Sequence, residues 1–504
     1  MHKYLYFFLF LIITSLCTCT SKKEKAARLY AQNCASCHIA PDINSVPKEF
    51  WKKEILQDMA ARLGIKENNY VPYEGRSFTE QNAIISTGVY PSKPMISLKD
   101  WHAIRDYILN EAPDSLSKIE KTAVAPLMQF QSSTITIDST PGGNITFLDF
   151  SEKDSTLYLG DLYGRLRSYS FIDSTLSSPQ KFSNTISSYK KGKESDYLTL
   201  MGSLRPSDIP SGTLLSLKGN VATPIKSNLQ RPTHLLVEDL NEDGIDEIIV
   251  SEFGNLRGQL TLLSKPSLTA EYLDHVLLPQ AGVIQVIAKD MNKDHKKDLV
   301  VLTTQGDESI TILYQQENLN FKIHKAIRFS PVYGSSWFQL IDYDFDGDLD
   351  IITVQGDNAD MSMTLKPYHG MRIYLNDGTN TFDEAYFYPM YGATRLIAQD
   401  FDKDKDIDFA ILSTFPDYTD PDIRSFVYLE NKSAKDFTFT THTGPDLKIG
   451  KWFLMDKGDV DTDGDEDIIL SSFTYPYTPA PKELQEYWNE QNVDILILKN
   501  SLYE

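Results

Sequence analysis

Five acidic segments with one common spacing constrain the fold of this chain more than any other feature. In each segment, oxygen-bearing side chains recur at offsets of 0, +2, +4 and +8 from a first aspartate. The first aspartates follow one another at intervals of 51, 52, 58 and 59 residues, and they are Asp239, Asp290, Asp342, Asp400 and Asp459. A repeat of about fifty residues indicates one supersecondary unit used many times, with each unit burying its apolar surface against the next.

Each segment carries the side chains that bind a hard cation. Carboxylates at 0, +2 and +4 curl around one ion, and a backbone carbonyl at +6 and the acid at +8 complete the shell. Gly244, Gly347 and Gly464 permit a tight turn at +5. His295 and Lys405 occupy this position in the other two segments, which predicts distorted or weaker sites there. We expect three to five calcium ions, with the ligands Asp239, Asn241, Asp243, Glu247, Asp290, Asn292, Asp294, Asp298, Asp342, Asp344, Asp346, Asp350, Asp400, Asp402, Asp404, Asp408, Asp459, Asp461, Asp463 and Asp467.

Acidic hairpin turns without a metal are the alternative to these cation sites. Five matching quartets of acids would repel one another unless they were neutralised, so the pattern favours the cation. An EF-hand does not fit, because its loop requires a glutamate at position 12 and helices on both sides. Here short apolar runs typical of strands flank the first acidic segment at 235–237 and 248–250, and a further strand is expected at 259–263. Four short strands per unit are typical of a propeller blade.

The acidic segments and their flanking strands resemble FG-GAP/VCBS repeats, the calcium-binding blades that also form integrin α heads. The resemblance covers about residues 135–504 and implies a β-propeller. Two earlier units, at 143–169 and 196–217, keep the strands but lack the acids. The two units without acids and the five acidic units together predict seven blades. A strand near 133–137 would close the ring by pairing into the last blade, which removes free sheet edges.

The segment Cys34-Ala35-Ser36-Cys37-His38 is a C-x-x-C-H motif, which attaches one c-type haem. The two thiols add to the haem vinyl groups, and the histidine becomes the proximal iron ligand. A zinc site would need a second pair of ligands, and the other two cysteines, Cys17 and Cys19, lie in the leader. A redox-active pair would need a βαβ context, whereas this motif follows a predicted helix at 24–32.

The surrounding ninety residues resemble a class I cytochrome c, a small all-α domain. Helices are expected at 47–63 and 79–87, and a last helix begins after Ser97, which forms a capping box with Asp100. In that helix Leu98, Trp101, Ile104 and Ile108 recur at helical spacing and predict one face of a small core.

The resemblance implies that Met95, in a proline-flanked loop before the last helix, is the distal haem ligand. An open sixth position, or ligation by His102 or Met59, is the alternative. A haem held by histidine and methionine carries electrons and does little bond-making chemistry.

The N-terminus has the features of an export signal. Lys3 precedes an apolar run at 4–16, which is too short to span a bilayer comfortably. The step from Leu16 to Cys19 resembles a bacterial lipobox and implies lipidation of Cys19, with simple cleavage or an uncleaved anchor as the alternatives. The predicted order of domains is a signal at 1–19, a cytochrome c domain at 20–113, a linker at 114–134 and the propeller at 135–504.

The formal net charge of −21 argues against nucleic acid as a partner. We expect a lipid-anchored protein of the cell envelope, in the periplasm or at the cell surface. Its haem would carry single electrons to a redox partner protein, and its propeller would bind a protein or a glycan. Two alternatives remain: a propeller dehydrogenase or polysaccharide-active enzyme that drains electrons to the haem, and an adhesion protein with a redox-sensing haem. No catalytic residue is predicted, although the polar insertion at 203–212 is a candidate enzyme loop.

Overall fold

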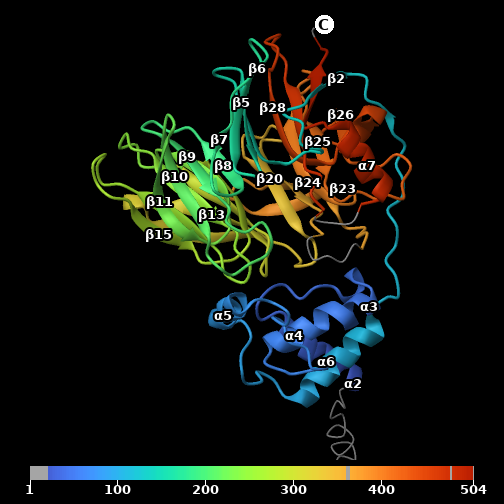
Figure 1. The fold of residues 1–504 in the computed structure, drawn as a ribbon. Coiled ribbons are helices and arrows are strands. Elements are labelled where there is room, and N and C mark those ends of the chain that lie inside the picture. Colours follow the sequence, from blue (N-terminus) through green and yellow to red (C-terminus); the bar gives the residue numbers. More distant parts are fainter. Residues whose placement is uncertain (1–20, 359–363, 477–479, 503–504) are drawn as a thin grey trace, which may run out of the picture. The chain divides into compact units, whose positions relative to one another are not determined.

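The computed structural model describes residues 21–358, 364–476 and 480–502 (Figure 1). The predicted signal and Cys19 lie outside the described residues. The chain divides into two compact units: residues 1–72 with 90–115, and residues 73–89 with 116–504. Within the described ranges, no helix is both long enough and apolar enough to cross a membrane.

The first unit is helical. Its elements are α2 (Lys22–Cys34), η1 (Ile43–Ser45), α3 (Lys48–Phe50), η2 (Trp51–Ile55), α4 (Leu56–Arg62) and α6 (Leu98–Glu111). A capping box formed by Ser21 and Glu24 begins α2. The side chain of Ser97 accepts a hydrogen bond from the Asp100 N–H at the start of α6, which is one half of the predicted capping box, and the Asp100 carboxylate accepts from Ser97 Oγ in place of the Ser97 N–H.

The helices α2 and α6 pack together and form the centre of this unit. The rings of Tyr30 and Tyr107, one from each helix, lie 6.2 Å apart. Trp101, Ile104 and Ile108 are buried, which confirms the predicted apolar face of α6. The expectation for Leu98 is wrong, because it is the first residue of the helix, one turn before the packed face, and remains 55% exposed.

The helix α5 (Phe78–Thr87) belongs to the second unit, although it lies between the other helices in the sequence. Its Glu80 side chain is buried and accepts hydrogen bonds from Ser207 Oγ at 2.9 Å and from the Asp208 N–H at 3.0 Å. The insertion at 203–212, a candidate enzyme loop from its sequence, therefore takes part in holding α5.

The rest of the second unit contains seven sheets of mainly antiparallel strands, which we number as blades 1 to 7. From the innermost strand outwards, blade 1 is β3 (Ile145–Ser151), β4 (Thr156–Asp161) and β5 (Arg165–Ser170), and β6 (Thr175–Leu176) and β7 (Gln180–Lys181) both pair with β5. Blade 2 is β8 (Ile186–Lys190), β9 (Asp196–Leu200), β10 (Gly212–Lys218) and β11 (Val221–Leu229). Blade 3 is β12 (Pro232–Glu238), β13 (Glu247–Glu252), β14 (Gln259–Ser264) and β15 (Leu273–Leu278).

Blades 4 to 7 follow the same order. Blade 4 is β16 (Val283–Lys289), β17 (Asp298–Thr303), β18 (Ser309–Gln315) and β19 (Phe321–Arg328), which η3 (Glu317–Leu319) precedes. Blade 5 is β20 (Ser335–Ile341), β21 (Asp350–Gln355), β22 (Gly370–Asn376) and β23 (Phe382–Pro389). Blade 6 is β24 (Ala393–Gln399), β25 (Asp408–Ser413), β26 (Phe426–Ser433) and β27 (Thr438–Thr443), with β1 (Ala125–Pro126) added at its edge. Blade 7 is β28 (Trp452–Gly458), β29 (Asp467–Ser472), β30 (Ile495–Asn500) and β2 (Phe130–Ile135), and η4 (Pro445–Ile449) precedes it.

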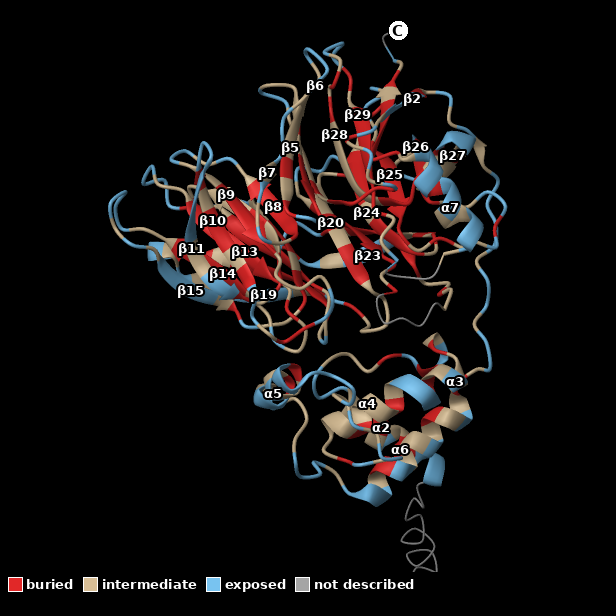
Figure 2. Ribbon diagram, viewed as in Figure 1, coloured by how far each residue is buried: buried red, intermediate tan, exposed pale blue. Residues whose placement is uncertain are grey.

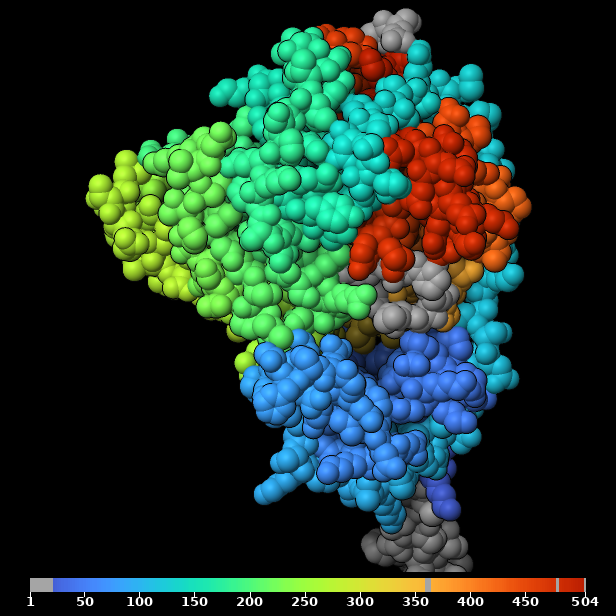
Figure 3. Space-filling model, in the orientation of Figure 1, coloured from blue at the N-terminus to red at the C-terminus, as the bar shows by residue number. Residues whose placement is uncertain are grey.

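The seven blades close into a ring. Each innermost strand contacts the next, from β3 through β8, β12, β16, β20 and β24 to β28, which contacts β3 again. The strand β2 pairs antiparallel with β30 in blade 7, from Phe130 opposite Asn500 to Ile135 opposite Ile495. This pairing confirms the predicted closing strand, which begins at Phe130 inside the stretch assigned to the linker. Residues of the last blade accordingly lie beside early propeller residues in Figure 3.

All seven innermost strands share a β-bulge at the second residue. In blade 1 the pairing shifts between Ile145 and Phe147, and in blade 6 it shifts between Ala393 and Arg395. The same irregularity recurs at the same place in the other five blades. Buried residues run along the central strands of the blades in Figure 2, and clusters such as that of β20–β22 with β24–β26 fill the space between neighbouring sheets. The two blades without acids are therefore true members of the repeat.

The connections between strands separate the two faces of the propeller. The five acidic segments all join a first strand to a second strand, so they lie on one face. The longest insertions join second to third strands, and their described parts, at 201–211, 356–358, 364–369, 414–425, 473–476 and 480–494, therefore lie on the opposite face. The last insertion carries the helix α7 (Lys482–Gln491).

Candidate metal centres and haem segment

The five acidic loops share one backbone conformation. At +3 all five residues have left-handed φ values, between 57° and 64°. At +5 the values are also positive: Gly244 90°, His295 67°, Gly347 91°, Lys405 80° and Gly464 97°. A glycine adopts this conformation without strain, whereas His295 and Lys405 adopt it at a cost. The fold thus imposes the same turn whether or not a glycine is present.

The same hydrogen bonds hold the acidic side chains in every loop. The carboxylate at +8 accepts a bond from the N–H at +1, with distances of 2.8 to 3.1 Å. The first aspartate accepts a bond from the N–H at +5, also at 2.8 to 3.1 Å. These bonds fix the orientation of the carboxylates at 0 and +8 in all five loops.

The acids at +8 begin the second strand of each blade and are almost completely buried. Burial raises the pKa of Glu247, Asp408 and Asp467 to about 7 and that of Asp350 to about 6, and it also raises the pKa of Asp298. A buried carboxylate is costly unless a positive charge lies beside it. The electrostatics of these positions therefore suit a bound cation.

Carboxylates from three of the loops converge within 4.8 Å of one another. The three groups are Asp342 with Asp344 and Asp350, Asp400 with Asp402 and Asp404, and Asp459 with Asp461 and Asp467. In each group one buried oxygen has no hydrogen-bond partner among the described residues, namely Asp342 Oδ1, Asp400 Oδ1 and Asp461 Oδ1. Oxygen ligands with unused lone pairs around a common centre fit a calcium ion.

Whether the carboxylates of a loop converge does not depend on a glycine at position +5. The loop at Asp400 converges although Lys405 replaces the glycine. The loop at Asp239 contains Gly244 and is absent from the groups of converging acids, and Lys193 Nζ lies 2.8 Å from Asp239 Oδ2. The loops at 239 and 290 each carry an asparagine at +2, so an amide oxygen replaces one carboxylate there.

The C-x-x-C-H motif begins at the end of α2. Cys34 is the last residue of this helix, and both Cys34 and Cys37 are free thiols. Burial raises the pKa of Cys34 to about 11, so this thiol is protonated at neutral pH. His38 Nδ1 lies 2.8 Å from the carbonyl oxygen of Ile39. A backbone bond at Nδ1 fixes the imidazole tautomer and leaves Nε2 free for a metal, which fits an axial haem ligand.

The Met95 loop lies against the segment after α4. The Met95 N–H donates to the Leu63 carbonyl at 2.9 Å. Gly64 is needed there, because a Cβ at this position would lie 2.3 Å from the carbonyl oxygen of Lys93. The Met95 side chain is nevertheless 68% exposed, so packing does not explain the methionine. His102 is exposed on α6, and Met59 is half-buried in α4.

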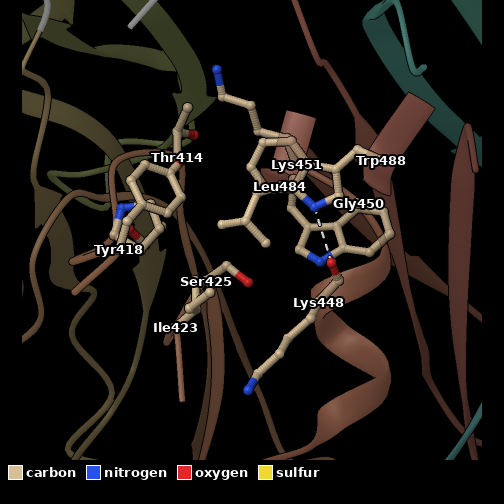
Figure 4. Close-up of a pocket in the computed structure, with 12 residues that line it drawn as sticks. Thr414, Tyr418, Ile423, Ser425, Lys448, Gly450, Lys451, Leu484 and Trp488 are labelled. Carbon is tan, nitrogen blue, oxygen red and sulfur yellow. Dashed lines mark hydrogen bonds between the residues drawn. The ribbon is translucent and has the colours of Figure 1, made fainter. Parts of the chain in front are cut away.

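A pocket that sequence reasoning missed lies beside α7 (Figure 4). Trp488 Nε1 donates to the Lys448 carbonyl at 2.9 Å and anchors the helix there. Lys451 also lines the pocket, and burial lowers its pKa to about 8. The composition of the insertion does not signal this pocket, since its wall combines two consecutive blades.

Comparison with known proteins supports the repeat. A profile of the FG-GAP-like repeat matches residues 290–353, which include the second and third acidic loops. The chain therefore contains an FG-GAP repeat within a seven-bladed propeller. No curated protein matches the chain significantly.

Several solved structures resemble this chain at low sequence identity. They include the propeller domain of Cps50 (Swd1) from Myceliophteria thermophila (10% identity, TM-score 0.42, covering 68% of this chain and 96% of that one). The Pan2 WD40 domain of Neurospora crassa matches at 10% identity and TM-score 0.41, over 71% of this chain and 88% of that one. BBS1N, solved in complex with ARL6DN, matches at 10% identity and TM-score 0.44, over 74% and 97%. At these TM-scores the similarities carry no functional information.

Proposed function

We propose that this chain is an exported haem c protein that carries single electrons and uses a calcium-stabilised propeller as a binding platform. The haem part rests on one observation: two free thiols at the end of α2 precede an imidazole whose Nδ1 is held by a backbone carbonyl. Cys34 and Cys37 would hold the haem covalently, and His38 Nε2 and the Met95 sulfur would be its axial ligands. One-electron transfer is the chemistry that such a haem supplies when bound.

The platform part rests on the arrangement of the loops. Long insertions share the face opposite the acidic loops, and a rigid scaffold that presents loops on one face is a common design for binding. Calcium in the acidic loops would neutralise the buried acids and stabilise the scaffold by mass action. A protein or a glycan is the expected ligand.

The haem proposal is tested by removing the attachment. The double variant Cys34→Ala/Cys37→Ala, produced with haem maturation, should lose haem staining in a denaturing gel. The matched variant Met95→Ala should keep the stain but change from a low-spin to a high-spin spectrum. Retained stain in the double variant would contradict haem attachment at this motif. Binding of carbon monoxide by the unmodified protein would contradict a closed His/Met iron and favour a sensor or an enzyme.

We also propose a lipid anchor at Cys19. Cys19→Ala should move the protein from the membrane fraction to the soluble extracytoplasmic fraction. An unchanged membrane fraction would count against the anchor.

A further inference from the structure

The axis of the propeller carries a cluster of side chains that neither the acidic loops nor the haem motif uses. Its members are His234, Trp337, Arg395 and Phe453, from the innermost strands of blades 3, 5, 6 and 7, and each stands near the start of its strand. The acidic loops follow the other ends of these strands. Asp400 comes five residues after Arg395, which corresponds to roughly 16 Å along a strand. The cluster is therefore separate from the candidate metal centres.

The four side chains meet inside the ring of blades. The guanidinium carbon of Arg395 lies 4.6 Å from the ring centre of Trp337 and 5.9 Å from that of Phe453. The rings of His234 and Trp337 are 6.4 Å apart, although blade 4 separates their blades in the ring. This contact spans the interior of the ring. All four residues keep intermediate exposure, so solvent reaches the cluster.

Arg395 carries a positive charge with little compensation. Its Nη1 donates to the Thr394 carbonyl at 2.7 Å, and it forms no ion pair with a carboxylate in the described part of the chain. Burial lowers its pKa to about 10, and Asp357 opposes this shift only through a longer-range attraction. Removing a charge from water without a paired partner is expensive.

The other arginines stacked on aromatic rings in the described ranges are compensated. Arg62, Arg165 and Arg372 each form an ion pair with at least one carboxylate. Arg231 donates to three backbone carbonyls. Arg395 differs from these arginines, because its guanidinium donates to one backbone carbonyl and otherwise lies over two aromatic rings.

We propose that Arg395 binds the oxyanion of a small ligand, a carboxylate or a sulfate-like group, at the axial end of the propeller that faces away from the acidic loops. The planar guanidinium fork matches such groups, and the rings of Trp337 and Phe453 hold it in place before binding. His234 Nδ1 is buried without a hydrogen-bond partner and offers a second donor. Burial lowers the pKa of His234 to about 3, so its ring is neutral at pH 7 and can carry the proton on Nδ1. Because the inner strands close around the cluster, the ligand is a small molecule and not an extended chain.

The test uses the full chain with calcium, and its probes are sodium sulfate and glutarate at constant ionic strength against chloride. The unmodified protein should bind at least one probe saturably by calorimetry. Arg395→Met keeps the packing on the rings and should weaken that binding at least tenfold, which is about the contribution of one charge-assisted hydrogen bond. The matched control Arg372→Met removes a ring-stacked arginine that has its own carboxylate, and it should bind as the unmodified protein does.

Two further readouts separate binding from a structural role. Without probe, Arg395→Met should melt at the same temperature as the unmodified protein or higher, since an uncompensated charge is removed. A lower melting temperature together with no saturable binding by the unmodified protein would overturn the proposal. If the methionine variant does not fold, Arg395→Lys takes its place, because it keeps the positive charge but loses the two-pronged guanidinium. If that variant binds glutarate as tightly as the unmodified protein does, the proposal is also overturned. Binding of a tetraglutamate peptide without binding of glutarate would rule out a small ligand.

Discussion

Blades 1 and 2 differ from the five acidic blades most clearly in one connection, the hairpin between the first and second strands. This hairpin has four residues in blade 1 and five in blade 2, but eight in each acidic blade. In blade 1, Asp154 forms an ion pair with Lys191 of blade 2 at 2.9 Å. In three of the acidic blades the carboxylates instead gather around a shared centre. The short hairpin of blade 1 thus pairs its acid with a lysine, whereas the loop at 342–350 carries five aspartates, of which Asp348 pairs with Lys293.

The features common to all seven blades show what a blade requires. Each has the bulge in the first strand, and each packs an apolar sheet against its neighbours. Blades 1 and 2 reach this architecture without an acidic loop. The loop is therefore an addition to the blade, and removing its cation should affect blades 3 to 7 much more than blades 1 and 2.

Removal of divalent cations should have the largest effect. Each ion bound at a hundred times its dissociation constant contributes about 2.7 kcal/mol to the free energy of unfolding. Loss of three ions should then lower the melting temperature by on the order of 10 °C. Hydrogen exchange should accelerate in β21, β25 and β29 but much less in β4 and β9. Uniform acceleration over all seven blades, or no shift with chelator, would contradict the distinction between the two groups.

The acidic blades could be predicted from sequence because each candidate site lies within nine consecutive residues. Backbone geometry inside one loop brings those residues together, so the spacing alone carries the information. The axial cluster could not be predicted in this way, because Trp337, Arg395 and Phe453 come from three blades and meet only once the ring has closed. Leu98 was misjudged for a related reason, since periodicity defines a helix face but not where the packing on that face begins.

A charge-removing substitution in one loop should sharpen the comparison. Asp463 is exposed and accepts a hydrogen bond from the Asp465 N–H at 3.1 Å, which Asp463→Asn preserves. With calcium, the variant should lose about 1–3 kcal/mol of unfolding free energy, as expected for a weakened cation site. With chelator, it should lose nothing, because repulsion among the acids is relieved.

The matched control for this variant is Asp377→Asn. Asp377 lies in a hairpin of blade 5 outside the acidic loops and accepts a bond from the Thr379 N–H at 2.8 Å. Urea unfolding should show a change below about 0.5 kcal/mol for the control in both conditions. A stabilising effect of Asp463→Asn in calcium would mean that the loop is an acidic turn without a cation.

The features shared by all blades should respond equally in both groups. Thr146 in blade 1 donates from Oγ1 to the Ile186 carbonyl of blade 2 at 2.7 Å. Thr233 in blade 3 donates to the Val283 carbonyl of blade 4 at 3.3 Å. Thr146→Val and Thr233→Val should each cost about 1 kcal/mol of unfolding free energy, with or without calcium. A cost for Thr233→Val that disappears on chelation would show that the seams of the acidic blades depend on the cation.

The smallest effect concerns the loop turn itself. Lys405 has a φ of 80°, where a side chain costs roughly 1–2 kcal/mol and a glycine costs nothing. Lys405→Gly relieves this strain but adds freedom to the unfolded chain, so the net gain in unfolding free energy should be roughly 0.5 kcal/mol. Lys405→Ala is the control, because it removes the side chain without relieving the strain and should bring no gain. If the glycine and alanine variants change the unfolding free energy equally, loss of the lysine contacts determines the result and the backbone does not. The left-handed turn would then cost this blade nothing.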